Sequence, residues 1–482
     1  MLDQFARQNR WWGDRADIRR DRHLVRLRES RLAWRPDLPF AFEQDAVYTL
    51  RGPRQVGKST VLKRQVNALL LADWPARKLL YLDVELAGLE RSRDLVAALR
   101  AYLDSERSTG WQTEERLAIF LDEVTRVEHW AGALRGLIDN DELRGTTVVA
   151  TGSHTRDLRE GGERLPGRRG GGSELDLELL PLSFREYVAL LDPALALPPP
   201  VASLQRDDLR AGRRDRDTVR PRLGALFERY LATGGFLTGI NDEAASGGVR
   251  AETFQAHREA IVGEFTRAGL REAYLREVIN WLASHLGQEF DYRGIAADTD
   301  IGSKDTARSY LDHLTATYVA HVFLRTPDLH KPSPGFRGPK KVHTLDPLLW
   351  HLIRAWAAND PDPWLASLAA IARPDDIGHL VESVVGVHFR RAFGDRVFYW
   401  RPDQRREIDF VVAPQREVAV CVEVKYQSRI DQRDARTISD TGGGLLLTSA
   451  WEGDLGGGAV YALPTAEALA LLDAPSLAPS RL

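Results

Sequence analysis

The chain has 482 residues, which is too long for a single hydrophobic core and predicts two to four domains. Hydrophobic residues make up 43% and charged residues 28%, a globular composition rather than a disordered one. No apolar run reaches the roughly 18 residues that cross a bilayer, and the basic start lacks the apolar segment of a signal peptide, so we expect no membrane partner. The single cysteine, Cys421, cannot form an internal disulfide, and we therefore expect a cytoplasmic protein. The net charge of −3 excludes no class of partner, because it averages over the domains.

The first 45 residues are rich in arginine and include Trp11, Trp12 and Trp34. We interpret this segment as a solvated N-terminal helical arm. Contact with nucleic acid is the alternative, because basic side chains interleaved with aromatic ones are typical of such contacts.

Residues 51–60, RGPRQVGKST, have the spacing of a phosphate-binding loop. The apolar run AVYTL before them predicts a short buried strand, and KSTVLKRQVNALLLA after them has apolar residues at helical spacing. In such a loop the backbone N–H groups and the positive helix end face phosphates. We expect Lys58 to reach the phosphates of ATP and the Ser59 hydroxyl to bind Mg²⁺. The other candidate nucleotide contacts are Gly52, Pro53, Arg54, Gln55, Val56, Gly57 and Thr60.

A second motif follows in ERLAIFLDEVTRVEHW, where the apolar run 117–121 precedes Asp122 and Glu123. A run of this kind predicts a parallel strand buried on both faces, whose carboxyl end meets the phosphates. We expect Asp122 to hold the water shell of Mg²⁺ and Glu123 to orient the attacking water as the catalytic carboxylate. The alternative is a strand followed by an acidic helix cap.

A third apolar strand, GTTVVATGSHT, ends at Thr151 and Ser153. Either side chain is a candidate sensor of the γ-phosphate, or a cap of the next helix. Arg168 and Arg169 follow in a glycine-rich stretch. One of them is a candidate arginine finger acting on a neighbouring subunit, which would require a homo-oligomer; a solvated basic loop is the alternative.

The segment 191–222 contains three consecutive prolines and a charge-dense stretch, so it predicts a linker that builds no core. Helical spacing resumes at Leu223. Further on, the predicted helices and strands of residues 276–345 follow the order of a winged helix, with a recognition helix over residues 303–317. That helix would offer Lys304, Arg308 and Tyr310 to DNA, although winged helices also serve as protein interaction modules.

Near the C-terminus, an amphipathic helix carrying Glu382 precedes three strand-like runs, DRVFYWR, REIDFVVA and EVAVCVEVKYQ. The last two are joined by a hairpin-sized turn, which predicts that Asp409 lies near Glu423. Glu423 and Lys425 are two residues apart on one strand and share a face. Two such carboxylates can bind Mg²⁺, and the lysine can assist an attacking water. A structural lysine–carboxylate pair across the hairpin is the alternative.

The motifs GPRQVGKST, IFLDEVTRVEHW, ATGSHT, LPGRRG, LLPLSFREY and ATGGF occur in an order that resembles a bacterial and archaeal group of AAA-type ATPases. This group is related to the archaeal STAND-like ATPases and carries a C-terminal domain of unknown function. The Asp409, Glu423 and Lys425 pattern resembles the active centre of the PD-(D/E)xK nuclease superfamily, and Glu382 matches an additional acidic residue found in many of its members.

The resemblance implies an α/β protein with an αβα P-loop ATPase domain, a helical and winged-helix middle, and a C-terminal restriction-endonuclease-like α/β domain. The expected function is Mg²⁺-dependent ATP hydrolysis in a DNA-associated protein with a metal-dependent nuclease-like domain, in which Glu382, Asp409 and Glu423 hold the metal. The alternative is a nucleotide-dependent switch or scaffold whose other domains only bind protein or nucleic acid. We expect the following domain ranges: arm 1–45, ATPase core 46–190, linker 191–222, helical lid 223–275, winged helix 276–345, nuclease-like domain 346–470 and tail 471–482.

Overall fold

The computed structural model describes residues 2–108, 116–154, 170, 174–201, 203–211, 213–414 and 418–479. The chain forms two compact units. Unit 1 consists of Met1–Leu180, Ala316–Tyr318 and Leu477–Ser480, and unit 2 consists of Pro181–Thr315, Val319–Ser476 and Arg481–Leu482. Both units combine helices with sheets, so the predicted α/β class is confirmed. No helix in the described part of the chain is both long enough and apolar enough to span a bilayer.

Unit 1 is built on one sheet whose strand order is β15-β5-β1-β4-β3-β2. All neighbouring strands run parallel except β15, which pairs antiparallel with β5. The central strands β1, β3 and β4 are buried along their whole length, because helices cover both faces of the sheet. The strand bounds are β1 Ala46–Arg51, β2 Leu79–Asp83, β3 Leu117–Asp122, β4 Thr146–Gly152, β5 Asp176–Leu179 and β15 Leu477–Pro479.

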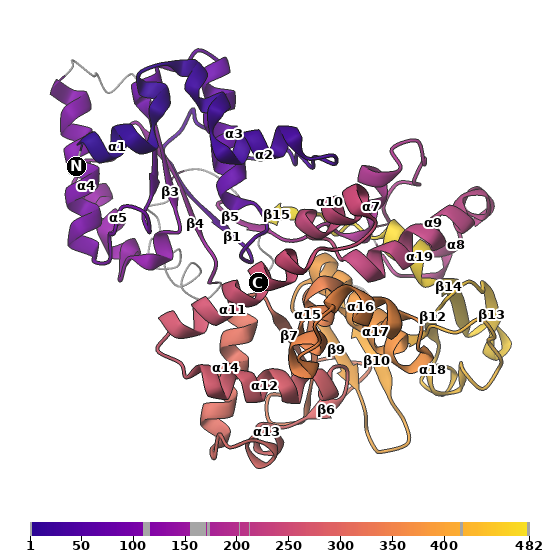
Figure 1. The fold of residues 1–482 in the computed structure, drawn as a ribbon. Helices are drawn as coiled ribbons and strands as arrows, with labels where there is room; N and C mark the ends of the chain where they lie inside the picture. Colours follow the sequence, from indigo (N-terminus) through magenta and orange to yellow (C-terminus); the bar gives the residue numbers. More distant parts are fainter. Residues whose placement is uncertain are drawn as a thin grey trace. The chain divides into compact units, whose positions relative to one another are not determined.

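The helices of unit 1 form two layers, one on each face of the sheet, and each layer packs on the sheet through its own hydrophobic cluster (Figure 1). On one face of the sheet lie α1 (Leu2–Gln8), α4 (Ser92–Ser108) and α5 (Trp130–Asp139). On the other face lie α2 (Arg22–Glu29) and α3 (Lys58–Leu71). Short 3₁₀ turns connect these elements: η1 Arg10–Trp12, η2 Arg15–Arg20, η3 Ala76–Lys78 and η4 Val124–Arg126.

The N-terminal segment belongs to this core, so the prediction of a solvated arm is wrong. Asn9 is fully buried; its side chain donates to the carbonyl of Tyr81 (2.8 Å) and accepts from the N–H of Tyr81 (2.6 Å). The indole N–H of Trp11 donates to the carbonyl of Leu79 at 3.3 Å. These three hydrogen bonds satisfy backbone groups on the outer edge of β2, where no strand among the described residues pairs with it.

Unit 2 contains a three-stranded antiparallel sheet in the order β6-β8-β7. Along the chain, its elements run helix, strand, helix, helix, strand, strand. The hydroxyl of Ser303 accepts from the N–H of Thr306 at 3.1 Å, which starts the predicted helix in the expected place. The bounds are α12 Glu272–His285, β6 Glu289–Phe290, α13 Tyr292–Asp298, α14 Lys304–Ala316, β7 Ala320–Leu324 and β8 Lys340–Thr344.

A six-stranded mixed sheet, β13-β14-β12-β11-β10-β9, forms the C-terminal part of unit 2. The predicted hairpin is confirmed, because β10 and β11 pair antiparallel with Phe410 opposite Val422. Strand β12 then runs parallel to β11 and β14, and α17 (Pro374–Phe393) packs against β9, β10 and β11. The bounds are β9 Val397–Trp400, β10 Ile408–Val412, β11 Val420–Lys425, α18 Arg436–Asp440, β12 Gly444–Thr448, β13 Gly453–Leu455, η5 Gly456–Gly458, β14 Val460–Pro464 and α19 Thr465–Leu471.

The remaining described helices of unit 2 include one that lies partly inside the predicted linker. Helix α9 begins at Arg213, and the guanidinium of Arg216 is buried between Glu452 (3.3 Å) and Glu467 (2.9 Å). The prediction that this charge-dense stretch builds no core is therefore wrong, because its arginines are paired with buried carboxylates. The bounds are α7 Phe184–Leu191, α8 Arg206–Arg210, α9 Arg213–Thr233, α10 Leu237–Ser246, α11 Ala251–Arg267, α15 Pro347–Ala358 and α16 Pro363–Ile371.

A buried histidine on α11 makes the stability of unit 2 depend on pH. Burial lowers the pKa of His257 to about 4, and its Nε2 makes no hydrogen bond within the described residues. Since the unfolded chain binds this proton near pH 6.5, stability is complete above that pH and falls as the pH drops toward 4. At pH 5 the expected cost is about 2 kcal/mol. His257→Leu should show a smaller fall in Tm between pH 8 and pH 5 than the unmodified chain; an equal fall would contradict this assignment.

Candidate nucleotide site and a second carboxylate centre

The phosphate loop spans the turn from β1 to α3, and two of its glycines have backbone geometry that other residues rarely adopt. A Cβ on Gly52 would lie 2.0 Å from the carbonyl oxygen of Leu179, which no side chain tolerates. Gly57, the residue before α3, has φ = 107°. The loop therefore needs glycine at both positions, as its sequence spacing predicts.

Lys58 is held inside this loop. Its ammonium donates to the carbonyls of Gly52 (2.9 Å) and Pro53 (3.1 Å), and it is only 5% exposed. Its Nζ lies 3.6 Å from Oε1 of Glu123. The predicted phosphate-binding lysine and the predicted catalytic carboxylate are thus an ion pair.

Asp122 closes the carboxyl end of β3 and is 1% exposed. One carboxylate oxygen accepts from the Tyr81 hydroxyl at 2.6 Å and the other from the Thr151 hydroxyl at 2.5 Å. Two hydroxyl donors on the neighbouring strands β2 and β4 therefore fix the orientation of this carboxylate. Burial, followed by the charge of Asp122, raises the pKa of Tyr81 well above its usual value, so the hydroxyl stays a donor.

Glu123 follows with φ = 54° and ψ = 41°, a left-handed conformation that is uncommon for glutamate. Its N–H donates to the Thr151 hydroxyl at 3.1 Å, and its Oε2 accepts from the Ser153 hydroxyl at 3.3 Å. Strained backbone of this kind concentrates at functional sites. Here it directs the carboxylate to Lys58 and Ser153, which come from two other elements.

The two candidate sensors are thus placed differently. Ser153 contacts the carboxylate of Glu123, the predicted catalytic residue, whereas Thr151 holds Asp122 and the backbone of Glu123. Arg168 and Arg169 lie outside the described residues. Tyr81 was not predicted as a site residue. Its one indication in the sequence is a hydroxyl group within the otherwise aliphatic run LLYL of β2.

A second group of carboxylates gathers in unit 2 around the hairpin of β10 and β11. Oδ2 of Asp409 accepts from the N–H of Val424 at 2.8 Å, so Asp409 reaches the strand that carries Glu423. Oε1 of Glu423 lies 2.9 Å from Nζ of Lys425, while its Oε2 is buried without a hydrogen bond among the described residues. Burial raises the pKa of Glu423 to about 7 and also raises the pKa of Asp409.

Lys341 on β8, which sequence reasoning did not single out, lies among these carboxylates. Its buried Nζ is 2.8 Å from Oε1 of Glu382 and 3.7 Å from Oδ1 of Asp409, and it also pairs with Glu407. Burial opposes the charge of Lys341, but the three carboxylates outweigh it and raise its pKa. Within the described residues no three His, Cys, Asp or Glu side chains are arranged to hold a metal ion. The centre has oxygen donors of the type that Mg²⁺ prefers, with an ammonium among them.

The predicted recognition helix α14 differs from expectation at one residue. Lys304 and Arg308 are exposed. Tyr310 is buried, and its hydroxyl donates to the carbonyl of Arg271 at 3.0 Å. The prediction that Tyr310 is offered to DNA is therefore wrong, because this side chain packs into the core of unit 2.

Strand, phosphate loop, helix and a buried carboxylate at the end of β3 define a P-loop ATPase-like domain in unit 1. Two family models match the chain: "AAA domain" over residues 44–188 and "Domain of unknown function (DUF4143)" over residues 377–443. The first match shows that this domain is similar to AAA-type ATPase domains. The second covers the hairpin with Asp409 and Glu423 and assigns no activity.

Comparisons with individual proteins are more distant. An uncharacterized protein of Methanocaldococcus jannaschii is 33% identical over 141 residues, which is 29% of this chain and 27% of that protein. The match therefore spans about a quarter of this curated relative. Two solved structures of RuvB variants from Thermotoga maritima are 15% and 16% identical and cover 68% and 59% of this chain, and 90% and 82% of theirs. Their TM-score is 0.26, at which no shared fold is defined.

Proposed function

We propose that this chain binds and hydrolyses ATP with Mg²⁺ and that it works in association with DNA. The ion pair between Lys58 and Glu123 carries the first part of this proposal. It joins the phosphate loop to the carboxylate at the end of β3, at the edge of the sheet where parallel α/β folds bind their ligands.

The geometry suggests what each residue does. Lys58 would exchange the carbonyls of Gly52 and Pro53 for phosphate oxygens, which frees Glu123 to accept a proton from the attacking water or to orient it. Ser153 would keep Glu123 in place through the hydroxyl contact at 3.3 Å. Ser59 and Asp122 would hold Mg²⁺, which neutralises phosphate charge when bound.

Nucleotide binding in the presence and absence of Mg²⁺ tests this assignment. We expect the intact chain to bind a fluorescent ATP analogue and to bind it more tightly with Mg²⁺ than with EDTA. Ser59→Ala, which removes one hydroxyl from the first turn of α3, should lose most of that difference. Failure of the intact chain to bind ATP, or a Mg²⁺ effect that survives in Ser59→Ala, would contradict the proposal.

Association with DNA is supported by the order of elements in unit 2. Helix, strand, helix, helix, strand, strand with a β6-β8-β7 sheet is the order of a winged helix, in which α14 occupies the position of the recognition helix. Its exposed Lys304 and Arg308 are suited to phosphate contacts.

A second candidate function, metal-dependent cleavage of DNA, is favoured by Oε2 of Glu423, which is buried beside Asp409 and Lys425 and has no hydrogen-bond partner among the described residues. An unpaired buried carboxylate oxygen costs free energy unless another group meets it. In this proposal Glu382, Asp409 and Glu423, which are not arranged as a metal site in the described structure, would come together to hold the metal after Lys341 moves aside, and Lys425 would assist the water. The alternative is that Lys341 is a permanent counter-charge, and unit 2 then acts only as a binding scaffold.

Replacing Lys341 distinguishes these possibilities. Lys341→Met removes the positive charge but keeps the length of the side chain. We therefore expect it to bind Mn²⁺ about tenfold more tightly or more, since an ammonium no longer competes for the same oxygens. Lys331→Met, on the exposed loop after β7, is the control. Cleavage of plasmid DNA that requires Mn²⁺ and is lost in Asp409→Ala would support the nuclease proposal. Unchanged Mn²⁺ binding in Lys341→Met, with no cleavage, would support the scaffold.

A further inference from the structure

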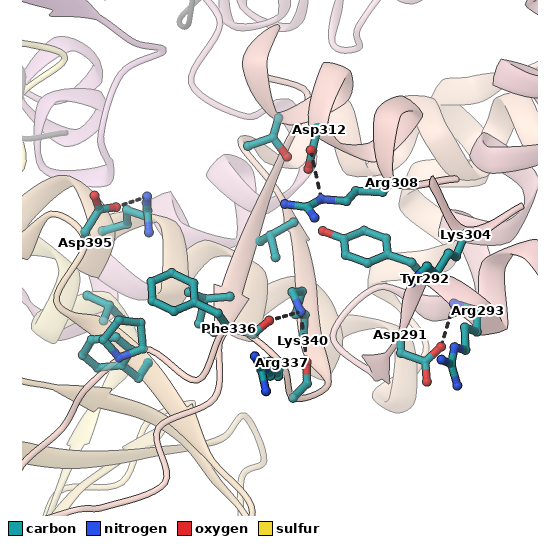
Figure 2. Close-up of a pocket in the computed structure, with 18 residues that line it drawn as sticks. Asp291, Tyr292, Arg293, Lys304, Arg308, Asp312, Phe336, Arg337, Lys340 and Asp395 are labelled. Atoms are coloured by element: carbon teal, nitrogen blue, oxygen red, sulfur yellow. Dashed lines mark hydrogen bonds and ion pairs between the residues drawn. The ribbon is translucent and has the colours of Figure 1, made fainter. Parts of the chain in front are cut away.

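Unit 2 contains a cavity of about 1010 Å³ beside the predicted recognition helix (Figure 2). Helices α13 and α14 line one side of it. Strands β7 and β8, the loop between them, and the region from Arg390 to Phe398 line the rest. Its size is at the upper end of the range of ligand sites.

The walls of this cavity are more basic than the chain as a whole. Six cationic side chains and three carboxylates line it, an excess of three positive charges in a chain whose net charge is −3. Two of the carboxylates pair with cations of the same cavity, Asp395 with Arg390 and Asp312 with Arg308 at 3.5 Å, and Asp291 accepts backbone N–H groups. The six cations are Arg293, Lys304, Arg308, Arg337, Lys340 and Arg390.

Two of these cations, Lys340 and Arg308, lie close to the ring of Tyr292. Nζ of Lys340 lies 5.3 Å and the guanidinium carbon of Arg308 lies 5.8 Å from the centre of the Tyr292 ring. Burial, and then the charge of Arg308, lower the pKa of Lys340. An anion bound between the two cations would relieve this repulsion, as a phosphate does between neighbouring basic side chains.

An aromatic side chain is also presented to solvent at the cavity. Phe336, on the loop between β7 and β8, is 73% exposed. Figure 2 places it across the cavity from Tyr292 and Arg308. A basic cavity with an exposed aromatic ring has the two features with which proteins hold single strands: cations for the backbone and a ring for a base.

The position of α14 decides between a single strand and a duplex. Lys304, Arg308, Asp312 and Thr315 lie at helical spacing on one face, and all four line the cavity. A recognition helix enters the major groove when that face projects from the protein. Here the loop carrying Phe336 and the segment carrying Asp395 lie opposite the same face, so this face does not project freely as a duplex would require.

We propose that this cavity binds a segment of single-stranded DNA, with the phosphates on the α14 cations and a base on Phe336. The inference rests on the DNA association proposed above and specifies its ligand. It assigns roles to Lys304, Arg308 and Phe336 that are independent of ATP.

Fluorescence anisotropy with a labelled oligothymidylate and with a duplex of the same length tests the inference on the full chain. We expect the single strand to bind at least about tenfold more tightly than the duplex. Lys304→Ala combined with Arg308→Ala should reduce the slope of log K against log salt by about 1.4, the value for two phosphate contacts on a single strand. Phe336→Ala should weaken single-strand binding about tenfold with little change in that slope.

Arg276→Ala, on the exposed surface of α12 and outside the cavity, is the matched control and should bind as the unmodified chain does. Duplex binding as tight as single-strand binding would overturn this inference but leave DNA association standing. Binding to neither would overturn both. Single-strand binding that survives the α14 and Phe336 variants would also overturn the inference, because the strand would then lie elsewhere.

Discussion

Glu123→Gln is expected to abolish ATP hydrolysis while leaving ATP bound. The amide has the shape of the carboxylate and still accepts from the Ser153 hydroxyl, but it has no charge with which to pair with Lys58 or take a proton from water. Loss of a general base lowers the rate by about a hundredfold to ten-thousandfold. Nucleotide affinity should stay the same or rise, because Lys58 is no longer drawn toward a negative side chain.

Phosphate release under saturating ATP and equilibrium binding of an ATP analogue measure the two effects separately. Glu128→Gln is a matched control, since the same change is made five residues further on at an exposed position. Hydrolysis that continues at more than a tenth of the normal rate in Glu123→Gln would show that another residue orients the water.

Arg216→Met should destabilise unit 2 more than any substitution on its surface. Arg216 is 1% exposed and contacts both Glu452 and Glu467, and it also donates to the carbonyl of Ala211 at 2.7 Å. Removing one partner of a buried ion pair costs about 3–5 kcal/mol, because the remaining charge stays buried and uncompensated. Arg220 also pairs with both glutamates, so we expect a value near the lower end of that range.

Thermal unfolding of Arg216→Met beside Arg213→Met measures this effect. Arg213 also pairs with Glu452, at 3.3 Å, but its side chain is 45% exposed, so its loss should cost roughly 1 kcal/mol or less. A clear fall in Tm for the first variant and a small one for the second is the expected result. Equal falls in Tm for the two variants would mean that burial does not determine how much these ion pairs stabilise unit 2.

The parts of the nucleotide site that could be predicted from sequence are those in which function depends on local spacing. The phosphate loop, Lys58 and Glu123 each lie within a few residues of an apolar run that forms a strand. The hydrophobic pattern that predicts the strand therefore also locates these residues at its carboxyl end. The hairpin that brings Asp409 to Glu423 was predictable for the same reason, because its two strands follow one another directly in the sequence.

Contacts between distant segments could not be predicted in this way. Arg216 lies 251 residues before Glu467, and the charge density around it has the composition of a solvated linker. Asn9 contacts a strand edge 72 residues away, and nothing near it in sequence indicates that edge. Tyr81 and Lys341 likewise take their roles from carboxylates on other strands. In each case the partner of a buried polar side chain lies far away in the sequence, and folding brings the two together.

Phosphate release from ATP by the full chain with Mg²⁺, measured beside Lys58→Met, tests most directly whether the Lys58–Glu123 pair belongs to a working ATPase. We predict steady release by the unmodified chain and a loss of about a hundredfold or more in the variant, since the phosphates lose their buried cation. Release at equal rates by both proteins, or by neither, would contradict that assignment.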